Sequence, residues 1–303
     1  MRMEKHTNSR PPIAGGLLAG IDVGGTKILG GLVSSDGKVV FEHRMPTRRE
    51  HLLEDIVDVG RAIVAEAGHE ARAIGIGTTG YVDRENGVLR QSMNMGIGGL
   101  PLAKSLTEAT GLPVFVENDV HAATVGEIHF GAGRRYEDFI LYNAGTGLAT
   151  GMVFAGRLHR GASNYAGENG HMSIDQSHTT ICRCGCSGCV ESLLLAARKG
   201  IDTVPAYLPR IEAPENKEYG YLALNLVQLI NLLNPPAVVL AGGMFNGNPA
   251  ATEWVKRAVR AHALPNALLG LREIELSRNA HFTGLIGAAA LTREAATKQG
   301  LED

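Results

Sequence analysis

The stretch LLAGIDVGGTKILGGLV, residues 17–33, decides the fold of this chain. An apolar run typical of a buried strand leads to a glycine-rich turn, and a second apolar strand follows. The stretch FILYNAGTGLATGMVFAGRL, residues 139–158, repeats this plan, because a shift of 121 residues places Asp22 on Asn143 and aligns the glycines of the two turns. We therefore interpret the chain as an internal duplication in which each half begins with a glycine hairpin.

The rest of the chain alternates helical and strand patterns, which predicts a parallel α/β fold. We expect helices over 50–67, 120–130, 221–233 and 284–296, and buried strands over 112–118 and 237–243. Ligands of such sheets bind at the carboxyl ends of the strands. The residues that fall at these ends are Asp22, Asp119, Asn143, Gly242 and Gly243.

The composition indicates a soluble globular protein, because 29 basic and 31 acidic residues nearly balance. This balance argues against electrostatic binding to nucleic acid or to an anionic membrane surface. The sequence also has no apolar signal segment and no run of about eighteen apolar residues that would span a bilayer. We expect a cytoplasmic protein without nucleic-acid or membrane partners, with a flexible tail over residues 1–16 followed by two lobes.

The two glycine turns favour phosphate binding. They expose backbone N–H groups where no Cβ blocks a ligand, and a pair of such turns can cradle a polyphosphate. The alternative is a pair of ordinary glycine-rich β-turns. Two other nucleotide motifs fail, because GIGTTG (75–80) lies in a strand pattern without the helix of a dinucleotide site, and GGTK (24–27) lacks P-loop spacing.

All four cysteines of the chain lie within residues 182–189. In a reducing compartment, clustered thiols are more often metal ligands than disulfides. One imidazole and three thiolates would close a tetrahedral shell around a structural Zn²⁺, and the predicted ligands are His171, Cys182, Cys184 and Cys189. Cys186 is then spare. The alternatives are surface thiols, a redox pair of Cys186 and Cys189, and His178 as a competing ligand.

Asp119 follows a buried strand and begins a helix, which leaves two roles open. Either Asn118 or Asp119 can cap the helix N-terminus. Asp119 can also act as a general base that takes the proton of a substrate hydroxyl as it attacks a γ-phosphoryl group. The two roles are compatible, and the phosphate-binding turns favour the second.

These motifs together resemble the ROK family of sugar kinases and sugar-responsive repressors. The resemblance covers the chain after about residue 17 and rests on DVGGTK (22–27), GIG with GYVD (75–83), ENDV with GE (117–127), GTG (145–147), GRLHRGASNYAGENGH (156–171), CRCGCSGCVE (182–191) and NPPAVVLAGG (234–243). It implies an α/β fold of the two-lobed actin and hexokinase type, a duplicated ribonuclease H-like fold with the active site in the interlobe cleft. The small lobe would comprise 17–118 and the C-terminal helix 284–303, and the large lobe 119–283 with the zinc loop.

The resemblance also implies roles for single residues. Asp119 would be the catalytic base for the sugar hydroxyl, normally that on C6. The sugar-binding residues would be Asn94, Asn118, Glu168, His171 and Glu191, with His171 bound to Zn²⁺ as well. The residues near ATP and its Mg²⁺ would be Asp22, Gly24, Gly25, Thr26, Lys27, Gly145, Thr146, Gly147, Gly242 and Gly243. A homodimer is implied as well.

The chain departs from the glucokinases of this family at Thr79, His121 and Asn169, where Pro, Asn and an aliphatic residue are usual. These polar side chains either read a substituent on an amino sugar, a cyclitol or another hexose, or belong to the packing around the site. We expect an ATP-dependent sugar kinase. A repressor would need a DNA-binding motif ahead of Asp22, where about twenty residues stand, and an inactive sugar sensor would have lost the base or the phosphate turns.

Overall fold

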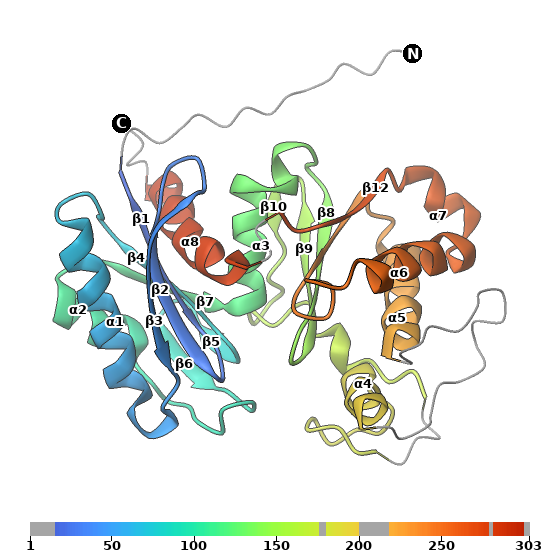
Figure 1. Ribbon diagram of the computed structural model, residues 1–303, viewed down its shortest axis with the longest axis horizontal. Helices are drawn as coiled ribbons and strands as arrows, with labels where there is room; N and C mark the ends of the chain where they lie inside the picture. The colour runs from blue at the N-terminus through green and yellow to red at the C-terminus, as the bar shows by residue number, and fades with distance from the viewer. Residues whose placement is uncertain (1–15, 176–179, 200–217, 279–280, 300–303) are drawn as a thin grey trace. The chain divides into compact units, whose positions relative to one another are not determined.

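The computed structural model describes residues 16–175, 180–199, 218–278 and 281–299. They form two compact units (Figure 1). The first unit holds the described residues up to Glu137, residues 153–166 and the chain from His281 on, and the second holds the described part of 138–152 and 167–280. The predicted tail, apart from Gly16, and the alternative ligand His178 lie outside the described residues.

A five-stranded sheet forms the centre of the first unit. Its strands, in the order β3, β2, β1, β4 and β7, span Val39–Pro46, Lys27–Val33, Leu18–Val23, Ile74–Thr78 and Val114–Asn118. β1, β4 and β7 run parallel, whereas β2 is antiparallel to β1 and β3. A short ribbon of β5 (Tyr81–Asp83) and β6 (Val88–Gln91) follows β4. The carboxyl ends of the three parallel strands therefore meet at one edge of the sheet.

A second sheet repeats this order strand by strand, as β10, β9, β8, β11 and β12. The bounds are Arg157–Leu158, Leu148–Phe154, Phe139–Ala144, Ala237–Ala241 and Glu273–Leu276. A shift of 121 residues carries β1 and β2 onto β8 and β9 with no change of length. β8, β11 and β12 are parallel, like β1, β4 and β7. The predicted duplication and the predicted α/β class are both confirmed.

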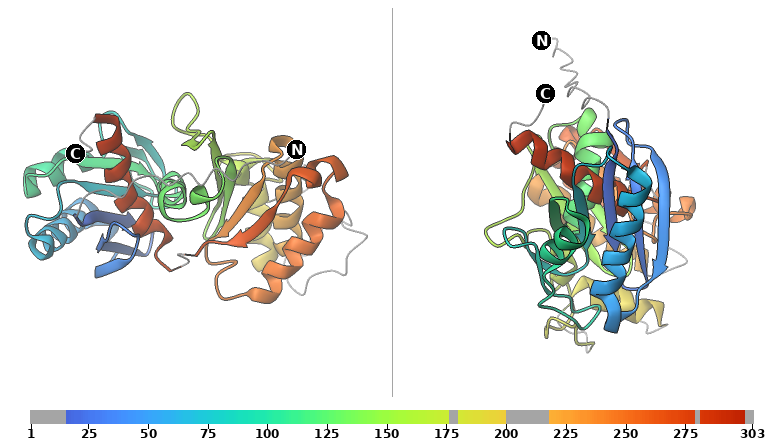
Figure 2. Two further views of the ribbon diagram at one scale, coloured as in Figure 1. Left: turned by 90° about the horizontal axis from the view of Figure 1, so that it is seen from above. Right: turned by 90° about the vertical axis from the view of Figure 1, so that its left-hand side faces the viewer.

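Helices cover both faces of the first sheet (Figure 1, Figure 2). One face carries α1 (Leu52–Ala67) and α2 (Leu102–Thr110), and the other carries α3 (Asp119–Phe130) and α8 (Thr283–Gln299). Successive strand residues point to opposite faces, so a Cβ on Gly30 would meet α1 and one on Gly31 would meet α8. The α8 backbone lies so close to β4 that a Cβ on Gly75 would overlap the carbonyl oxygen of Ala288. Glycine is therefore required at this position.

The helices of the second unit are α4 (Val190–Arg198), α5 (Glu218–Leu233), α6 (Pro249–His262) and α7 (Pro265–Gly270). Their apolar side chains and those of the second sheet share one core, in which Tyr142 of β8 and Leu222 of α5 are fully buried. Three short 3₁₀ turns complete the described elements: η1 (Arg49–His51), η2 (Ala132–Arg134) and η3 (Asn169–His171). Each helix and strand that the sequence predicts is present.

The two units divide elsewhere than between residues 118 and 119, the boundary expected from the sequence. α3 lies in the first unit because it packs along α8, where a Cβ on Gly126 would come within 3.0 Å of Gly287 Cα. Residues 153–166 also join the first unit. Across the described residues, no helix is both long and apolar enough to cross a membrane.

Candidate active site and metal centre

Asp119 lies where β7 ends and α3 begins. Asn118 is the N-cap of α3, and its side-chain oxygen accepts hydrogen bonds from the backbone N–H groups of Val120 at 2.9 Å and His121 at 3.2 Å. Asp119 is the first helical residue, and its carboxylate accepts the Val120 N–H at 3.0 Å. Burial raises the pKa of Asp119 above its ordinary value, and the Val120 hydrogen bond partly offsets this rise. The capping role thus belongs to Asn118, and the Asp119 carboxyl group has the properties of a proton acceptor.

Asp22 lies near Asp119, at the carboxyl end of β1. Burial, and then the charge of Asp119, raise the pKa of Asp22 to about 7, while the charge of Lys27 opposes the rise. The Asp22 carboxylate also packs against the first turn of α8, because a Cβ on Gly284 would overlap both of its oxygens. Each of the two carboxyl groups therefore lies at the N-terminus of a helix, where a negative charge is stabilised.

A buried ion-pair cluster supports the turn that carries Asp119. Glu117 at the end of β7 is fully buried, and the Nε atoms of Arg84 and Arg160 each lie 2.8 Å from its Oε2. Arg160 also pairs with Glu294 of α8 at 2.7 Å. Neither arginine is predicted from the sequence as a partner of Glu117, although Arg84 directly follows GYVD (80–83) and Arg160 lies within the segment 156–171. The ion pairs thus connect β7 with α8 and with the segment that carries Arg160.

Asn94, a predicted sugar-binding residue, is exposed after β6. Its Nδ2 donates a hydrogen bond to the hydroxyl of Thr79 at 3.3 Å. Thr79 is one of the three polar departures from the glucokinase pattern. This departure therefore contacts a predicted sugar-binding side chain.

The other two departures, His121 and Asn169, are buried and bonded to the protein itself. Nε2 of His121 lies 2.8 Å from the Ala166 carbonyl oxygen. The amide of Asn169 donates to Oδ1 of Asn225 at 2.6 Å, and the Tyr142 hydroxyl donates to the same oxygen at 3.1 Å. These two residues therefore belong to the packing around the predicted site.

The predicted phosphate turn of the first unit is held mainly by backbone groups. The Gly24 N–H donates to the Lys27 carbonyl at 3.0 Å, and the Thr47 N–H donates to the Thr26 carbonyl at 3.1 Å. The Thr47 hydroxyl also donates to the Gly24 carbonyl at 2.7 Å. Gly25, Thr26 and Lys27 are exposed. The tip of the turn is thus fixed in shape and open to a ligand.

The predicted phosphate turn of the second unit lies beside the loop that follows β11. The Gly145 N–H donates to the Gly147 carbonyl at 2.9 Å. Gly242 has φ of +91°, and a Cβ there would overlap the carbonyl oxygen of Ala144. A Cβ on Gly145 would come within 4.0 Å of the Gly243 nitrogen. The structure thus brings together the two glycine segments that sequence analysis assigns to the nucleotide in this unit.

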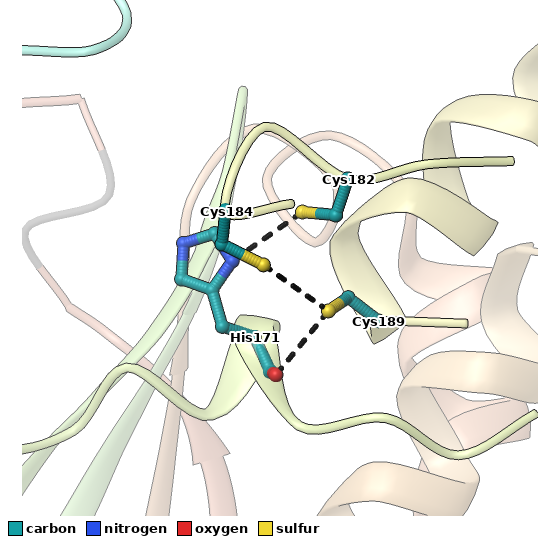
Figure 3. Close-up of side chains that lie close together, drawn as sticks. All are labelled: His171, Cys182, Cys184 and Cys189. Atoms are coloured by element: carbon teal, nitrogen blue, oxygen red, sulfur yellow. Dashed lines mark hydrogen bonds between the residues drawn. The ribbon is translucent and has the colours of Figure 1, made fainter. Parts of the chain in front are cut away.

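The cysteine cluster gathers where sequence analysis predicts a metal. Figure 3 shows the sulfur atoms of Cys182, Cys184 and Cys189 and the ring of His171 turned toward one another. The four ligand atoms all lie within 4.8 Å of one another. Nδ1 of His171 faces the thiols, and its Nε2 lies 3.9 Å from a carboxylate oxygen of Glu168. One ring nitrogen is thus placed for a metal and the other for a polar ligand.

The separations fit tetrahedral Zn²⁺. Bonds of about 2.3 Å to sulfur and about 2.0 Å to nitrogen place two sulfur ligands about 3.8 Å apart, and a sulfur about 3.5 Å from a nitrogen. The Cys184 and Cys189 sulfurs are 3.5 Å apart, and the Cys182 sulfur lies 3.4 Å from His171 Nδ1. Burial raises the pKa of the Cys189 thiol to about 12, so a thiolate there needs a cation beside it. Among the described residues, Cys186 is outside the cluster.

Comparisons with known proteins agree with this geometry. The sequence model of the ROK family matches residues 18–206 and 212–295 of this chain. The glucokinase of Streptomyces coelicolor is 29% identical over 314 residues, which cover 92% of this chain and 98% of that protein. A ROK hexokinase from Thermus thermophilus superimposes with a TM-score of 0.73 and 31% identity, over 94% of this chain and all of that one. A ROK glucokinase from Streptomyces griseus, in complex with glucose and AMPPNP, gives a TM-score of 0.71 and 29% identity, over 92% and 100%.

Proposed function

Because the chain belongs to the ROK family and is a carbohydrate kinase of the actin and hexokinase fold, we propose that it transfers the γ-phosphoryl group of ATP to the 6-hydroxyl of a hexose or hexose derivative, with Asp119 as the general base. The observation that carries this proposal is the Asp119 carboxyl group, which stands at the first turn of α3 with its pKa raised by burial. A general base is most effective when its pKa lies near the working pH.

In the proposed step, the Asp119 carboxylate takes the proton of the sugar hydroxyl as that oxygen attacks the γ-phosphorus, and ADP leaves. Asn118 keeps the carboxylate in position by capping α3, and its Nδ2 donates to the Gly80 carbonyl at 3.2 Å. Glu117 stabilises the same turn, because its Oε1 accepts the Asn118 N–H at 3.0 Å. The base is thus oriented by groups that do not themselves take the proton.

We assign the donor nucleotide to the two glycine turns, residues 24–27 and 145–147, with Gly242 and Gly243 beside the second. Asp22 would hold the Mg²⁺ that accompanies the nucleotide. The charge of Asp119 acts on the Asp22 carboxyl group, and a divalent cation would relieve the repulsion of the two charges. Bound Mg²⁺ supplies positive charge to the phosphate oxygens during transfer.

We assign the sugar acceptor to polar side chains that can both donate and accept hydrogen bonds or accept them as carboxylates, namely Asn94, Asn118, Glu168, His171 and Glu191. His171 supports this assignment best, since one ring nitrogen faces the thiols and the other faces Glu168. A structural Zn²⁺ held by His171, Cys182, Cys184 and Cys189 would fix the orientation of the ring.

An amino sugar or a cyclitol is the second candidate for the acceptor. The observation that favours it is the hydrogen bond between Asn94 and Thr79, because a hydroxyl group replaces the usual proline beside a predicted sugar contact. A side-chain amide held by a hydroxyl offers a different pattern of donors and acceptors to the substrate. Thr79→Pro should therefore shift the preference toward glucose if this contact selects the acceptor.

The test is ADP release from Mg-ATP with glucose, mannose, allose, glucosamine, N-acetylglucosamine, N-acetylmannosamine, kanosamine and inositols. We expect one acceptor to be turned over, and Asp119→Asn to lower kcat at least about 100-fold with the melting temperature kept. Asp58→Asn, which changes an exposed carboxylate of α1, is the matched control and should keep full activity. A near-normal rate for Asp119→Asn would refute the assignment of the base.

We also propose a cytoplasmic homodimer. The free thiols of the cysteine cluster suit a reducing compartment, and the dimer follows from the resemblance to the family. Light scattering coupled to gel filtration should give twice the chain mass of 32.1 kDa.

A further inference from the structure

The helix α4 connects the metal cluster with the glycine turn at residues 145–148, here called the donor turn. We propose that α4 couples metal binding at the cysteine cluster to nucleotide binding at the donor turn, with Glu191 and Arg198 as the positioning residues that carry the coupling. This inference rests on the proposed function, because it takes the donor turn as a nucleotide-binding element.

The first end of α4 is built on a predicted metal ligand. Cys189 is the N-cap residue of the helix and is fully buried. Its carbonyl oxygen accepts the Leu193 N–H at 3.0 Å and the Ser192 hydroxyl at 2.7 Å. Its thiol lies 3.3 Å from the carbonyl oxygen of His171, a second predicted ligand (Figure 3). A metal bound by these side chains therefore fixes where α4 begins.

Glu191 connects the first turn of α4 to one side of the donor turn. One of its carboxylate oxygens, Oε2, accepts the Leu148 N–H at 3.2 Å. The same oxygen lies so near Gly147 that a Cβ there would come within 2.8 Å of it. Since Glu191 is two residues from Cys189, a shift of the metal ligand would move this hydrogen bond directly.

Arg198 connects the last turn of α4 to the other side of the donor turn. Its Nη2 donates to the Gly145 carbonyl at 3.2 Å. The side chain is exposed, so the guanidinium places a positive charge beside the backbone N–H groups that would receive the phosphates. A nine-residue helix is about 12 Å long and stiff over that length. Its two ends therefore hold Gly145 and Leu148 at a fixed separation.

These contacts predict a specific energetic link. With the metal bound, α4 is anchored and the donor turn is preorganised for the nucleotide. Without it, the loop that ends at Cys189 loses its cross-link, and Glu191 and Arg198 no longer fix the turn. By linkage, the nucleotide must also strengthen metal binding by the same factor. A metal that only stabilised its own loop would leave nucleotide affinity unchanged.

The experiment is titration calorimetry of ADP, without sugar, into zinc-loaded and chelator-stripped full-length protein. We expect stripping to raise the Kd for ADP at least about tenfold. In the zinc-loaded protein, Arg198→Ala and Glu191→Ala should each raise the Kd about three- to tenfold, because each removes one hydrogen bond to the donor turn. Both variants should then respond less than about twofold to stripping, because the link is already broken. Arg198→Lys should recover part of the loss.

Lys199→Ala is the matched control, since it removes an equal charge from the next exposed position. Zinc affinity measured by competition with a chelating dye, with and without ADP, gives the reciprocal readout on folded protein. Equal Kd values for loaded and stripped wild type together with no effect of ADP on zinc affinity, or equal effects of Arg198→Ala and Lys199→Ala, would overturn the coupling alone. Absence of ADP binding to the zinc-loaded wild type would overturn the proposed function as well.

Discussion

The two glycine turns of this protein have the same place in two duplicated sheets but are held differently. The turn at Gly24 is tied to the residue after β3, through the hydroxyl and N–H of Thr47. The turn at Gly145 is tied to charged side chains of α4, through Arg198 and Glu191. Duplication has kept the backbone of the hairpin, and the surroundings of each copy have diverged.

The side chains at the carboxyl ends of matching strands also differ between the two units. The first sheet presents carboxyl groups there, Asp22 after β1 and Asp119 after β7. At the matching positions the second sheet has an amide, Asn143 in β8, and a hydroxyl, Ser277 after β12. At these matching strand ends, carboxyl groups are thus found in the first unit and not in the second. Under the proposed function, the first unit supplies the general base, whereas the second supplies a turn whose support we propose to depend on a metal.

The largest effect should come from breaking the anchor of the second turn. Cys189→Ser removes a buried thiol of the proposed metal site, and we expect it to lower the free energy of unfolding by at least about 4 kcal/mol, because metal-binding energy is folding energy. Urea denaturation in the presence of Zn²⁺ measures this loss. Cys186→Ser is the control, and its change should stay within about 0.5 kcal/mol. Equal changes in the two variants would contradict the predicted ligand set.

An effect of at most about 4 kcal/mol, which depends on pH, should come from the carboxyl pair of the first unit. The pKa of Asp22 is about 7 in the folded protein and near 4 when unfolded, so the native state binds more protons between these pH values. Stability from this group is therefore present below about pH 4 and is lost as pH rises to about 7. Asp22→Asn removes this loss. The free energy of unfolding of the variant relative to wild type should therefore rise by about 2 to 4 kcal/mol between pH 4 and pH 8.

Urea denaturation of ligand-free protein across this pH range checks the prediction for Asp22. Asp58→Asn on the exposed face of α1 is the control and should differ from wild type by a nearly constant amount. A constant difference for Asp22→Asn as well would mean that its folded pKa is ordinary.

The smallest effect should come from the turn that Thr47 supports. Thr47→Val removes the hydroxyl donor to the Gly24 carbonyl, and we expect a loss of about 1 kcal/mol in stability. ADP affinity should weaken by a few-fold and by equal amounts in zinc-loaded and stripped protein, because the hydrogen bonds that support this turn come from Thr47. If the effect of Thr47→Val on ADP affinity depended on zinc, the predicted difference between the two turns would be wrong.

Sequence reasoning found the features that depend on local pattern. The register of 121 residues between the hairpins follows from apolar runs and glycines whose spacing is visible in the chain. The predicted metal ligands follow from soft donors at close spacing, and the predicted role of Asp119 follows from its position after a buried strand. These signals lie within single elements, and the structure confirms the elements that carry them.

Features that depend on long-range contacts were missed. The ion pairs of Glu117 join it to Arg84 and Arg160, which come from two distant segments and have no common spacing pattern. The burial of His121 and Asn169 depends on partners such as Asn225 that only the folded chain brings close. The division of the chain after Glu137 depends on α3 packing against a helix more than 150 residues away. These contacts join residues that are far apart in the sequence, so no pattern within a short segment predicts them.

The close packing of α8 on the first sheet has a consequence for synthesis. Gly75 lies against the backbone of α8, which follows every other described helix and strand, although the strand of Gly75 is made about 200 residues earlier. Until Thr283–Gln299 leaves the ribosome, that face of the sheet therefore has α3 but lacks the second of its two covering helices. The second unit has its last described strand, β12, before that helix begins. Translation thus completes the described strands of the unit with the cysteine cluster before it makes α8, the helix that completes the first unit.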